Sequence, residues 1–395
     1  MKRSLFAGAA LLAAVILPAA VNAQETIKIG VITAFSGQFA DTSAQIDNGI
    51  KLYMKQHGDK VAGKKIEIIR KDTGGPNPDV SKRLAQELVV RDKADILAGF
   101  ALTPEALGAA SVADEAKKFM VVMNAATAVI TEKSPYIVRV SLTLPMIGET
   151  LGTWAVKKGG VKKAYTMVTD YGPGLDAEAA FQRAFKAAGG EIVGSVRMPI
   201  ANPDFSAFVQ RAKDLNPESI FVFVPAGAQP ASFAKALAER GVNPKTIKVM
   251  GTGELTDDSA IKQMGEAALD VITAWHYDHN HDSKMNKDFV AAFRKEANGV
   301  NPNFLAVGGY DGMHLIYESL KKAAGKTDGD ALIAAAKGMK WESPRGPVAI
   351  DPETRDIIQT IYIRRVQKVG NELVNVEFDK VENVKDPVKA AMKNN

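Results

Sequence analysis

The sequence contains no cysteine in its 395 residues. This absence excludes a disulfide framework and a lipid-anchor cysteine near the N-terminus. Neither a Gly-x-Ser-x-Gly nucleophile elbow nor a complete phosphate-binding loop is present. Gly251 and Gly253 follow an apolar run, but Thr256 stands where a dinucleotide-binding fingerprint needs its third glycine. We therefore expect no cofactor and no enzymatic activity.

An excess of one charge is also missing. The chain carries 50 Lys and Arg residues against 45 Asp and Glu residues. Without Lys2 and Arg3, the formal net charge is only +3, from 48 basic and 45 acidic residues. Because no arginine-rich stripe or basic tail is present, we expect no nucleic-acid partner.

A long apolar run occurs only near the N-terminus. Met1–Arg3 is charged, Leu5–Leu17 is apolar, and Val21–Ala23 has the small-x-small pattern of a cleavage site. This arrangement predicts a signal peptide over residues 1–23, and therefore export to the periplasm. No later stretch approaches the ~20 apolar residues of a membrane span.

The remaining 372 residues (395 − 23) are too many for one ordinary core, so two lobes are expected. Strand and helix patterns alternate, which predicts an α/β fold with mainly parallel sheets. Helical patterns near residues 285–297 and 306–324 follow the second α/β half and suggest discontinuous lobes. The predicted limits are 24–141 plus 276–342 for lobe 1, and 142–275 plus 343–395 for lobe 2.

The stretch from Asp95 to Thr127 organises the first half. It reads as a strand, a turn, a helix opened by Pro104, a second strand and a second turn. Two hydroxyl-bearing turns, at Thr103 and Thr127, therefore follow consecutive strands, at the edge where α/β proteins bind ligands. Free amides and hydroxyls suit a small carboxylate. The alternative is that both threonines cap helices.

Two polar residues occupy the matching edge of the second half. Tyr171 lies between a predicted strand and helix, and Glu254 follows another strand. In the binding interpretation Tyr171 covers the ligand and Glu254 meets a cation. Alternatively, Tyr171 shields a helix start and Glu254 is solvated.

Three of the five histidines, His276, His279 and His281, lie close together beside Asp278 and Asp282. This density could hold zinc, which makes a zinc-dependent hydrolase one alternative function. In a continued strand, however, His276 would point away from the other two. A polar crossover between lobes is the other interpretation.

Several short segments together resemble the leucine/isoleucine/valine-binding family of periplasmic solute-binding proteins of ABC transporters. The segments are Ile29-Gly30-Val31 to Phe35-Ser36-Gly37, Asn124-Ala125-Ala126-Thr127, Tyr171-Gly172-Pro173-Gly174, Asp204-Phe205-Ser206, Met250-Gly251-Thr252-Gly253-Glu254 and Arg345-Gly346-Pro347. The resemblance covers essentially the whole mature chain. It implies two Rossmann-like lobes joined by three crossovers, which close on the ligand by hinge motion.

The resemblance also implies roles for individual residues. Thr103 and Thr127 would hold the ligand carboxylate, and the Ala125 carbonyl and Glu254 would meet an ammonium group. Tyr171 would cover the ligand. The expected site residues are Phe39, Ala101, Thr103, Ala125, Thr127, Tyr171 and Glu254.

The sequence also departs from the amino-acid binders. Ala226 replaces their second gating aromatic residue, and their disulfide is missing. Phe39 and Ser343–Pro347 are more similar to relatives that bind aromatic carboxylates.

The expected function is capture of a small carboxylate by a monomer and its delivery to ABC permease membrane subunits. An apolar or branched-chain amino acid is the leading ligand, and an aromatic or 2-oxo carboxylate is the alternative. A sensory domain that feeds a receptor is a further alternative from another class.

Overall fold

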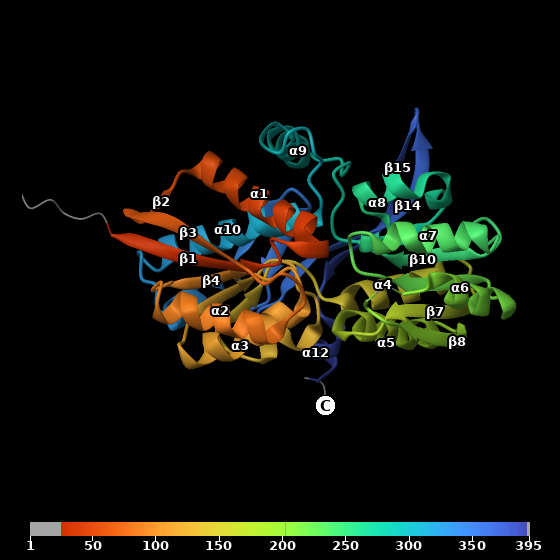
Figure 1. The fold of residues 1–395 in the computed structure, drawn as a ribbon, viewed down its shortest axis with the longest axis horizontal. Coiled ribbons are helices and arrows are strands. Elements are labelled where there is room, and N and C mark those ends of the chain that lie inside the picture. Colours follow the sequence, from red (N-terminus) through yellow and green to blue (C-terminus); the bar gives the residue numbers. More distant parts are fainter. Residues whose placement is uncertain (1–24, 202, 393–395) are drawn as a thin grey trace, which may run out of the picture.

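The computed structural model describes residues 25–201 and 203–392. The signal peptide expected at residues 1–23 lies outside these ranges. The chain forms two α/β halves that lie side by side, each built on a sheet with helices on its faces (Figure 1). The predicted fold class, two α/β halves with mainly parallel sheets, is confirmed.

The first half contains a six-stranded sheet with the order β2-β3-β1-β4-β5-β6. All neighbouring strands are parallel except β2, which is antiparallel to β3. The central strands β4 and β5 are buried along their whole length, as expected where helices cover both faces. The strands are β1 (Thr26–Thr33), β2 (Lys60–Val61), β3 (Lys64–Asp72), β4 (Ile96–Gly99), β5 (Phe119–Val122) and β6 (Ile137–Arg139).

Helices from two distant parts of the chain cover this sheet. Some follow its strands directly, namely α1 (Ala40–His57), α2 (Pro78–Val90) and α3 (Thr103–Glu115). The others come after the second half, namely α9 (Lys284–Glu296), α10 (Phe304–Lys322) and α11 (Gly329–Ala336). Helix α10 packs along α1, and α11 packs against β5 and β6. The chain therefore returns to its first half after it has formed most of the second.

The second half contains a nine-stranded sheet with the order β12-β13-β14-β11-β10-β9-β7-β8, to which β15 adds beside β14. Strands β7 to β11 are parallel, whereas β12 to β15 pair in antiparallel fashion. The strands are β7 (Lys163–Thr169), β8 (Glu191–Met198), β9 (Ser219–Phe223), β10 (Lys248–Thr252), β11 (Ile272–Trp275), β12 (Lys340–Ser343), β13 (Gly346–Ile350), β14 (Ile357–Val369) and β15 (Glu372–Val384).

The helices of the second half pack closely on one another. A β-carbon on Gly148 would lie 2.6 Å from the Ala177 carbonyl oxygen, and one on Gly152 would lie 2.7 Å from the Phe181 carbonyl oxygen. Glycine at both positions therefore lets α4 approach α5. The helices are α4 (Leu144–Lys157), α5 (Gly172–Ala187), α6 (Phe205–Asp214), α7 (Gln229–Glu239), α8 (Asp258–Met264) and α12 (Pro387–Met392).

Some elements differ from the sequence patterns. The strand predicted at residues 268–277 is only Ile272–Trp275, because a 3-10 turn covers Gly265–Ala268 and Asp270 has a φ of 65°. The patterns also missed α8, α11, α12, β2, β12 and β15. Strand β15 carries many charged residues and is held by its pairing with β14.

The segment after α11 contacts the first half before the chain enters β14. The Ser343 hydroxyl donates a hydrogen bond to Asp311 on α10 at 2.8 Å. The Arg355 Nε donates a hydrogen bond to the Ile137 carbonyl in β6 at 3.0 Å. The limits of the two lobes stay a prediction.

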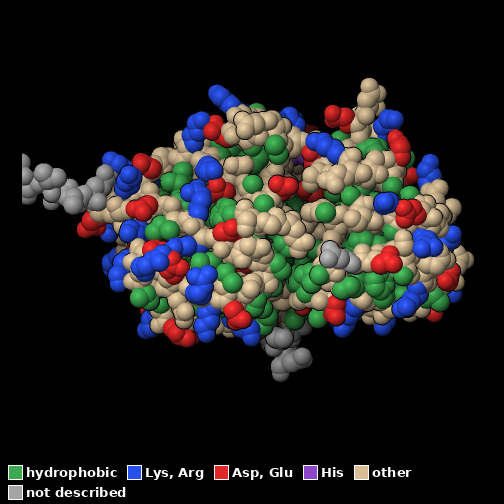
Figure 2. Space-filling view, in the orientation of Figure 1, with side chains coloured by type: hydrophobic (Ala, Val, Ile, Leu, Met, Phe, Trp, Pro, Cys, Tyr) green, Lys and Arg blue, Asp and Glu red, His purple; other side chains and the backbone are tan. Residues whose placement is uncertain are grey.

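The outer surface of the described chain carries mixed charge. Figure 2 shows Lys and Arg side chains interspersed with Asp and Glu over both halves on this face. Within the described ranges, no helix has the length and apolar character that crossing a bilayer requires.

Candidate ligand-binding site

A pocket lies where strands of both sheets end, between the two halves. It contains about 470 Å³ of empty space, a figure that includes its open mouth. Its lining residues are Phe39, Thr42, Ala101, Leu102, Thr103, Asn124, Ala126, Leu144, Tyr171, Pro173, Phe223, Pro225, Ala226, Glu254, Phe304 and Leu305. The structure thus brings together five of the seven predicted site residues: Phe39, Ala101, Thr103, Tyr171 and Glu254.

The first half contributes two turns, one after β4 and one after β5. Phe100 begins the first turn in the left-handed region, with a φ of 64°. The Thr103 hydroxyl lies 2.9 Å from the Thr127 hydroxyl, and the two share a hydrogen bond. Neither hydroxyl caps a helix: Leu102 occupies the cap position of α3, and Thr127 makes no side-chain cap bond. The hydroxyls therefore form a polar pair at the pocket wall.

A buried carboxyl supports the first of these turns from below. Glu105, in the first turn of α3, accepts a hydrogen bond from the Leu102 amide at 2.9 Å and one from the Thr73 hydroxyl at 2.7 Å. Burial raises the pKa of Glu105 to about 7. These bonds fix the main chain that places Thr103 at the pocket.

The other two predicted residues, Ala125 and Thr127, are not among the lining residues. Thr127 contacts the second half, because a β-carbon on Gly172 would lie 2.6 Å from the Thr127 Oγ1 atom. The Ala125 carbonyl accepts a hydrogen bond from Arg139 Nη1 at 3.0 Å. This carbonyl therefore already accepts one hydrogen bond from within the first half. That the Ala125 carbonyl also accepts a hydrogen bond from a ligand ammonium group stays a prediction.

The second half contributes an aromatic wall and a carboxyl. Tyr171 occupies the cap position before α5, and its ring centroid lies 5.9 Å from that of Phe223 at the end of β9. Burial raises the pKa of the Tyr171 hydroxyl, and the nearby Glu254 carboxyl adds to this shift. Tyr171 therefore remains a neutral hydrogen-bonding group at physiological pH.

Glu254 is the only acidic side chain among the lining residues. It is 8% exposed, and burial raises its pKa to about 8. Within the described residues, its Oε2 atom has no hydrogen-bond partner. An isolated buried carboxylate is costly, so this group needs either a proton or a ligand that donates to it. Glu254 can therefore meet a cation when ionised, or hydrogen-bond a neutral polar group when protonated.

Several lining residues were not predicted. Phe223 follows the same rule that located Thr103, since it ends a parallel strand at the crevice edge, and this rule could have identified it. Phe304 begins α10, more than 130 residues beyond Tyr171 in the sequence, and no local pattern relates the two. Asn124 belongs to the second turn of the first half, and its side chain donates to the Ala101 carbonyl at 2.7 Å.

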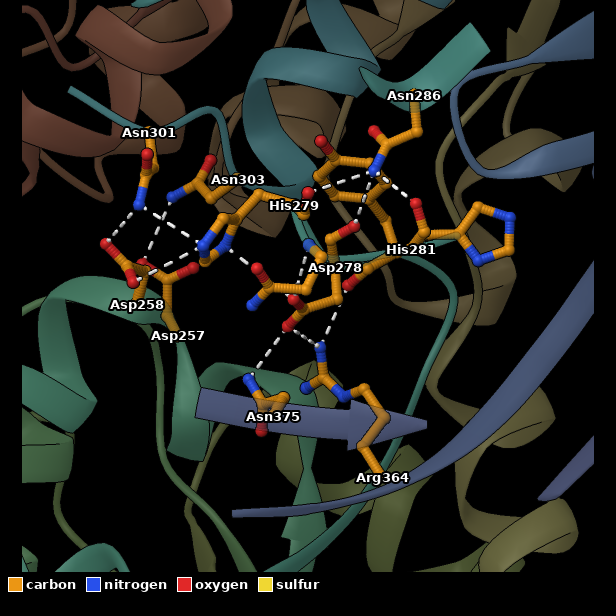
Figure 3. A network of polar contacts seen from close by, with 12 residues as sticks. Asp257, Asp258, Asp278, His279, His281, Asn286, Asn301, Asn303, Arg364 and Asn375 are labelled. Carbon is orange, nitrogen blue, oxygen red and sulfur yellow. Dashed lines mark hydrogen bonds and ion pairs between the residues drawn. The ribbon is translucent and has the colours of Figure 1, made fainter. Parts of the chain in front are cut away.

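The three clustered histidines do not converge on one point. His276 is buried against Trp275 and Phe304, and neither of its ring nitrogens has a hydrogen-bond partner in the described chain. His279 lies near Asp258 and Asn301 (Figure 3), whereas His281 lies 2.9 Å from Glu377. Within residues 25–201 and 203–392, no cluster of three or more potential ligands could hold a metal ion.

The same region forms a polar network across the crevice. Asn301 donates to Asp258 at 3.1 Å, and Asn303 donates to Asp257 at 3.2 Å (Figure 3). A second contact between the halves is the Ala128 amide, which donates to the Asp176 carboxylate at 2.8 Å. Direct hydrogen bonds therefore join the two halves at more than one place.

Comparison with known proteins gives the same family throughout. A model of the periplasmic binding protein family matches residues 26–371. The chain is 43% identical over 373 residues to the Leu/Ile/Val-binding protein homolog 6 of Brucella melitensis, which covers 94% of this chain and 95% of that protein.

Solved structures extend the match to the fold. The solute-binding protein of an ABC transporter from Rhodopseudomonas palustris BisB5, in complex with 3,4-dihydroxybenzoic acid, is 57% identical, with a TM-score of 0.89 over 92% of this chain and 99% of that chain. A solute-binding protein from Rhodopseudomonas palustris HaA2, in complex with p-hydroxybenzoic acid, is 44% identical, with a TM-score of 0.89 over 93% of this chain and 100% of that chain. Since the family model and these relatives span nearly the whole sequence, the chain belongs to the periplasmic binding protein family of ABC-transporter solute-binding proteins.

Proposed function

We propose that this protein captures a hydroxybenzoate-type aromatic carboxylate in the periplasm and delivers it to an ABC permease. The observation that carries the proposal is the composition of the pocket. Aromatic side chains from both halves line it (Phe39, Tyr171, Phe223 and Phe304), together with polar groups at separate turns. Aromatic walls suit a planar ring, and the few polar groups would set its orientation.

The polar groups divide into two sets. Thr103 and Asn124, with the turn that contains Ala126, supply hydroxyl, amide and main-chain groups for the ligand carboxylate. Glu254 lies on the wall that the second half supplies, where it would hydrogen-bond a ring hydroxyl while it holds its proton. The 3,4-dihydroxybenzoic acid and the p-hydroxybenzoic acid found in complex with two relatives carry such hydroxyls.

An apolar amino acid is the second candidate ligand, and it led the sequence-based expectation. Its ammonium group would pair with ionised Glu254, whose Oε2 atom has no partner in the described chain. The relative named a Leu/Ile/Val-binding protein homolog supports this candidate. Ala226, which is small and lies at the pocket edge, leaves room for a ring and favours the aromatic acid.

The proposed mechanism is closure of two lobes around the ligand. A ligand that contacts both walls stabilises the closed form through its differential contacts with that form. The lobes would follow the predicted limits, 24–141 plus 276–342 and 142–275 plus 343–395. The hydrogen bonds from Asn301 and Asn303 to Asp258 and Asp257 would form as the lobes meet. A monomer suffices for this mechanism, and no catalytic step is required.

Isothermal titration calorimetry on the purified mature protein tests the proposal. 4-Hydroxybenzoate and 3,4-dihydroxybenzoate should bind and raise the thermal unfolding temperature, whereas leucine, valine and phenylalanine should not. The matched control is 4-hydroxybenzyl alcohol, which keeps the ring and hydroxyl but lacks the carboxylate. Binding of leucine without binding of either hydroxybenzoate would refute the aromatic proposal and support the amino acid.

A further inference from the structure

A buried arginine contacts the turn that follows β5 (residues 123–128, called the ligand turn). Arg139, at the end of β6, is 0% exposed. Its Nη1 donates to the carbonyls of Ala125 at 3.0 Å and Thr127 at 2.7 Å, and its Nη2 donates to the Ala128 carbonyl at 3.3 Å. One guanidinium group thus binds three carbonyls within four residues of the turn. Its remaining two N–H bonds go to a single carboxylate oxygen of Asp356.

These bonds determine where the amides of the turn point. In a trans peptide the N–H group points opposite to the C=O group of the same unit, and the described chain has no cis peptide. The Thr127 carbonyl points to Arg139, and the next amide, that of Ala128, points away from it and donates to Asp176 at 2.8 Å. By the same geometry the Ala126 amide points away from Arg139, on the turn whose residue Ala126 lines the pocket.

The position of Arg139 is itself fixed from distant parts of the chain. Asp356 ends the turn before β14, and it accepts from Arg139 Nε at 2.9 Å and Nη2 at 2.6 Å. Lys389 on α12 donates to the other Asp356 oxygen at 2.6 Å and to the Thr131 hydroxyl at 2.5 Å. The guanidinium therefore has little freedom to move away from the turn.

We propose that Arg139, held by Asp356, is a positioning residue for ligand binding: it holds the carbonyls of Ala125, Thr127 and Ala128 toward itself, so that the Ala126 amide faces the ligand carboxylate. This inference rests on the proposed function, because it assigns a carboxylate to that wall of the pocket. The positive charge of Arg139 lies at the carbonyl ends of these peptide groups. It therefore favours an anion at their N–H ends, as a helix N-terminus does.

The test compares two arginines of the same region. Arg139→Lys keeps a positive charge but removes the planar five-donor group. Arg355→Lys is the matched control, because Arg355 binds the neighbouring carbonyls of Ile137, Thr131 and Ser134 but none in the ligand turn. Calorimetry with 4-hydroxybenzoate gives the dissociation constant of each variant, and thermal unfolding gives its stability.

Arg139→Lys should raise the dissociation constant at least tenfold, whereas Arg355→Lys should change it less than threefold at a similar loss of thermal stability. Hydrogen–deuterium exchange of residues 123–128 in the unliganded protein should accelerate in Arg139→Lys alone. Equal affinities for the two variants, or unchanged exchange of that segment, would refute the positioning role. The exchange measurement needs no ligand, so it separates this inference from the proposed function, which fails if the wild type binds no hydroxybenzoate.

A second variant covers the case in which Arg139→Lys does not fold. Asp356→Asn keeps the shape of the side chain but removes the charge that holds the guanidinium. It should raise the dissociation constant at least fivefold and accelerate exchange of residues 123–128. A dissociation constant within twofold of the wild type, with unchanged exchange, would show that Arg139 serves only the fold.

Discussion

Glu254 leads to a prediction that separates the two ligand classes by proton uptake. In the structure, burial raises the pKa of this carboxyl from 4.5 to about 8. In an open crevice, water would return the pKa toward its ordinary value. Closure over a ligand without an ammonium group should therefore bind one proton. An amino acid would instead pair with ionised Glu254, and its binding should take up no proton.

The magnitude follows from the difference between the two pKa values. A change from 4.5 to about 8 corresponds to about 5 kcal/mol of preference for the protonated form. Because the closed form has the higher pKa, affinity for an aromatic acid is greatest at low pH and is lost as the pH rises through 8. Between pH 6 and pH 8 the affinity should fall about 50-fold, and at pH 7 binding should take up about 0.9 proton.

Calorimetry in buffers of different ionisation enthalpy measures this uptake directly. The window from pH 6 to pH 8 avoids the titration of the ligand's own carboxyl group. Glu254→Gln is the matched control, because it keeps the shape of the side chain and cannot titrate. Its affinity for 4-hydroxybenzoate should not depend on pH. Binding by the wild type without proton uptake, or the same pH dependence in Glu254→Gln, would refute the reasoning.

Three further substitutions test the crevice. Thr127→Ala should weaken carboxylate binding by about 1.5–3 kcal/mol while leaving the fold nearly intact, because a hydroxyl donor to a charged group is lost; unchanged affinity in calorimetry would remove Thr127 from the site. Asn303→Ala removes the bond to Asp257 and should weaken binding by about 0.5–1.5 kcal/mol, mainly through faster ligand dissociation in stopped-flow measurements; an unchanged dissociation rate would contradict the closing role. Gly172→Ala places a β-carbon 2.6 Å from the Thr127 Oγ1 atom and should prevent full closure of the two lobes. If small-angle X-ray scattering shows the same ligand-induced compaction as in the wild type, this prediction is wrong.

The sequence predicted much of the pocket wall that the first half supplies. The apolar run after Asp95 and the proline at position 104 predicted a strand and a helix, and the structure has β4 over Ile96–Gly99 and α3 over Thr103–Glu115. Both elements depend on local properties, namely a short apolar run and a residue that starts a helix without needing its amide. The turn between them could therefore be located from the sequence.

Elements that depend on distant partners were harder to predict. Strand β15 (Glu372–Val384) mixes six apolar with five charged residues, and it is extended because it pairs with β14 along almost its whole length. Helix α11 is only eight residues long and begins with Gly329 after the capping residue Asp328. Short or polar elements show weak periodicity, so their conformation follows from tertiary contacts.

By itself, the sequence determined the alternation of strands and helices and therefore the edge at which a ligand site forms. Thr103, Tyr171 and Glu254 could be named because each lies within four residues of the end of a recognisable strand. Only the tertiary structure brought Phe304 to the pocket and placed Arg139 against the carbonyls of the turn after β5. The physical reason is that hydrophobic periodicity records local burial, whereas the partners of a buried charge or a pocket wall depend on how distant segments pack. An arginine within an apolar run is the one local sign that such a partner must exist.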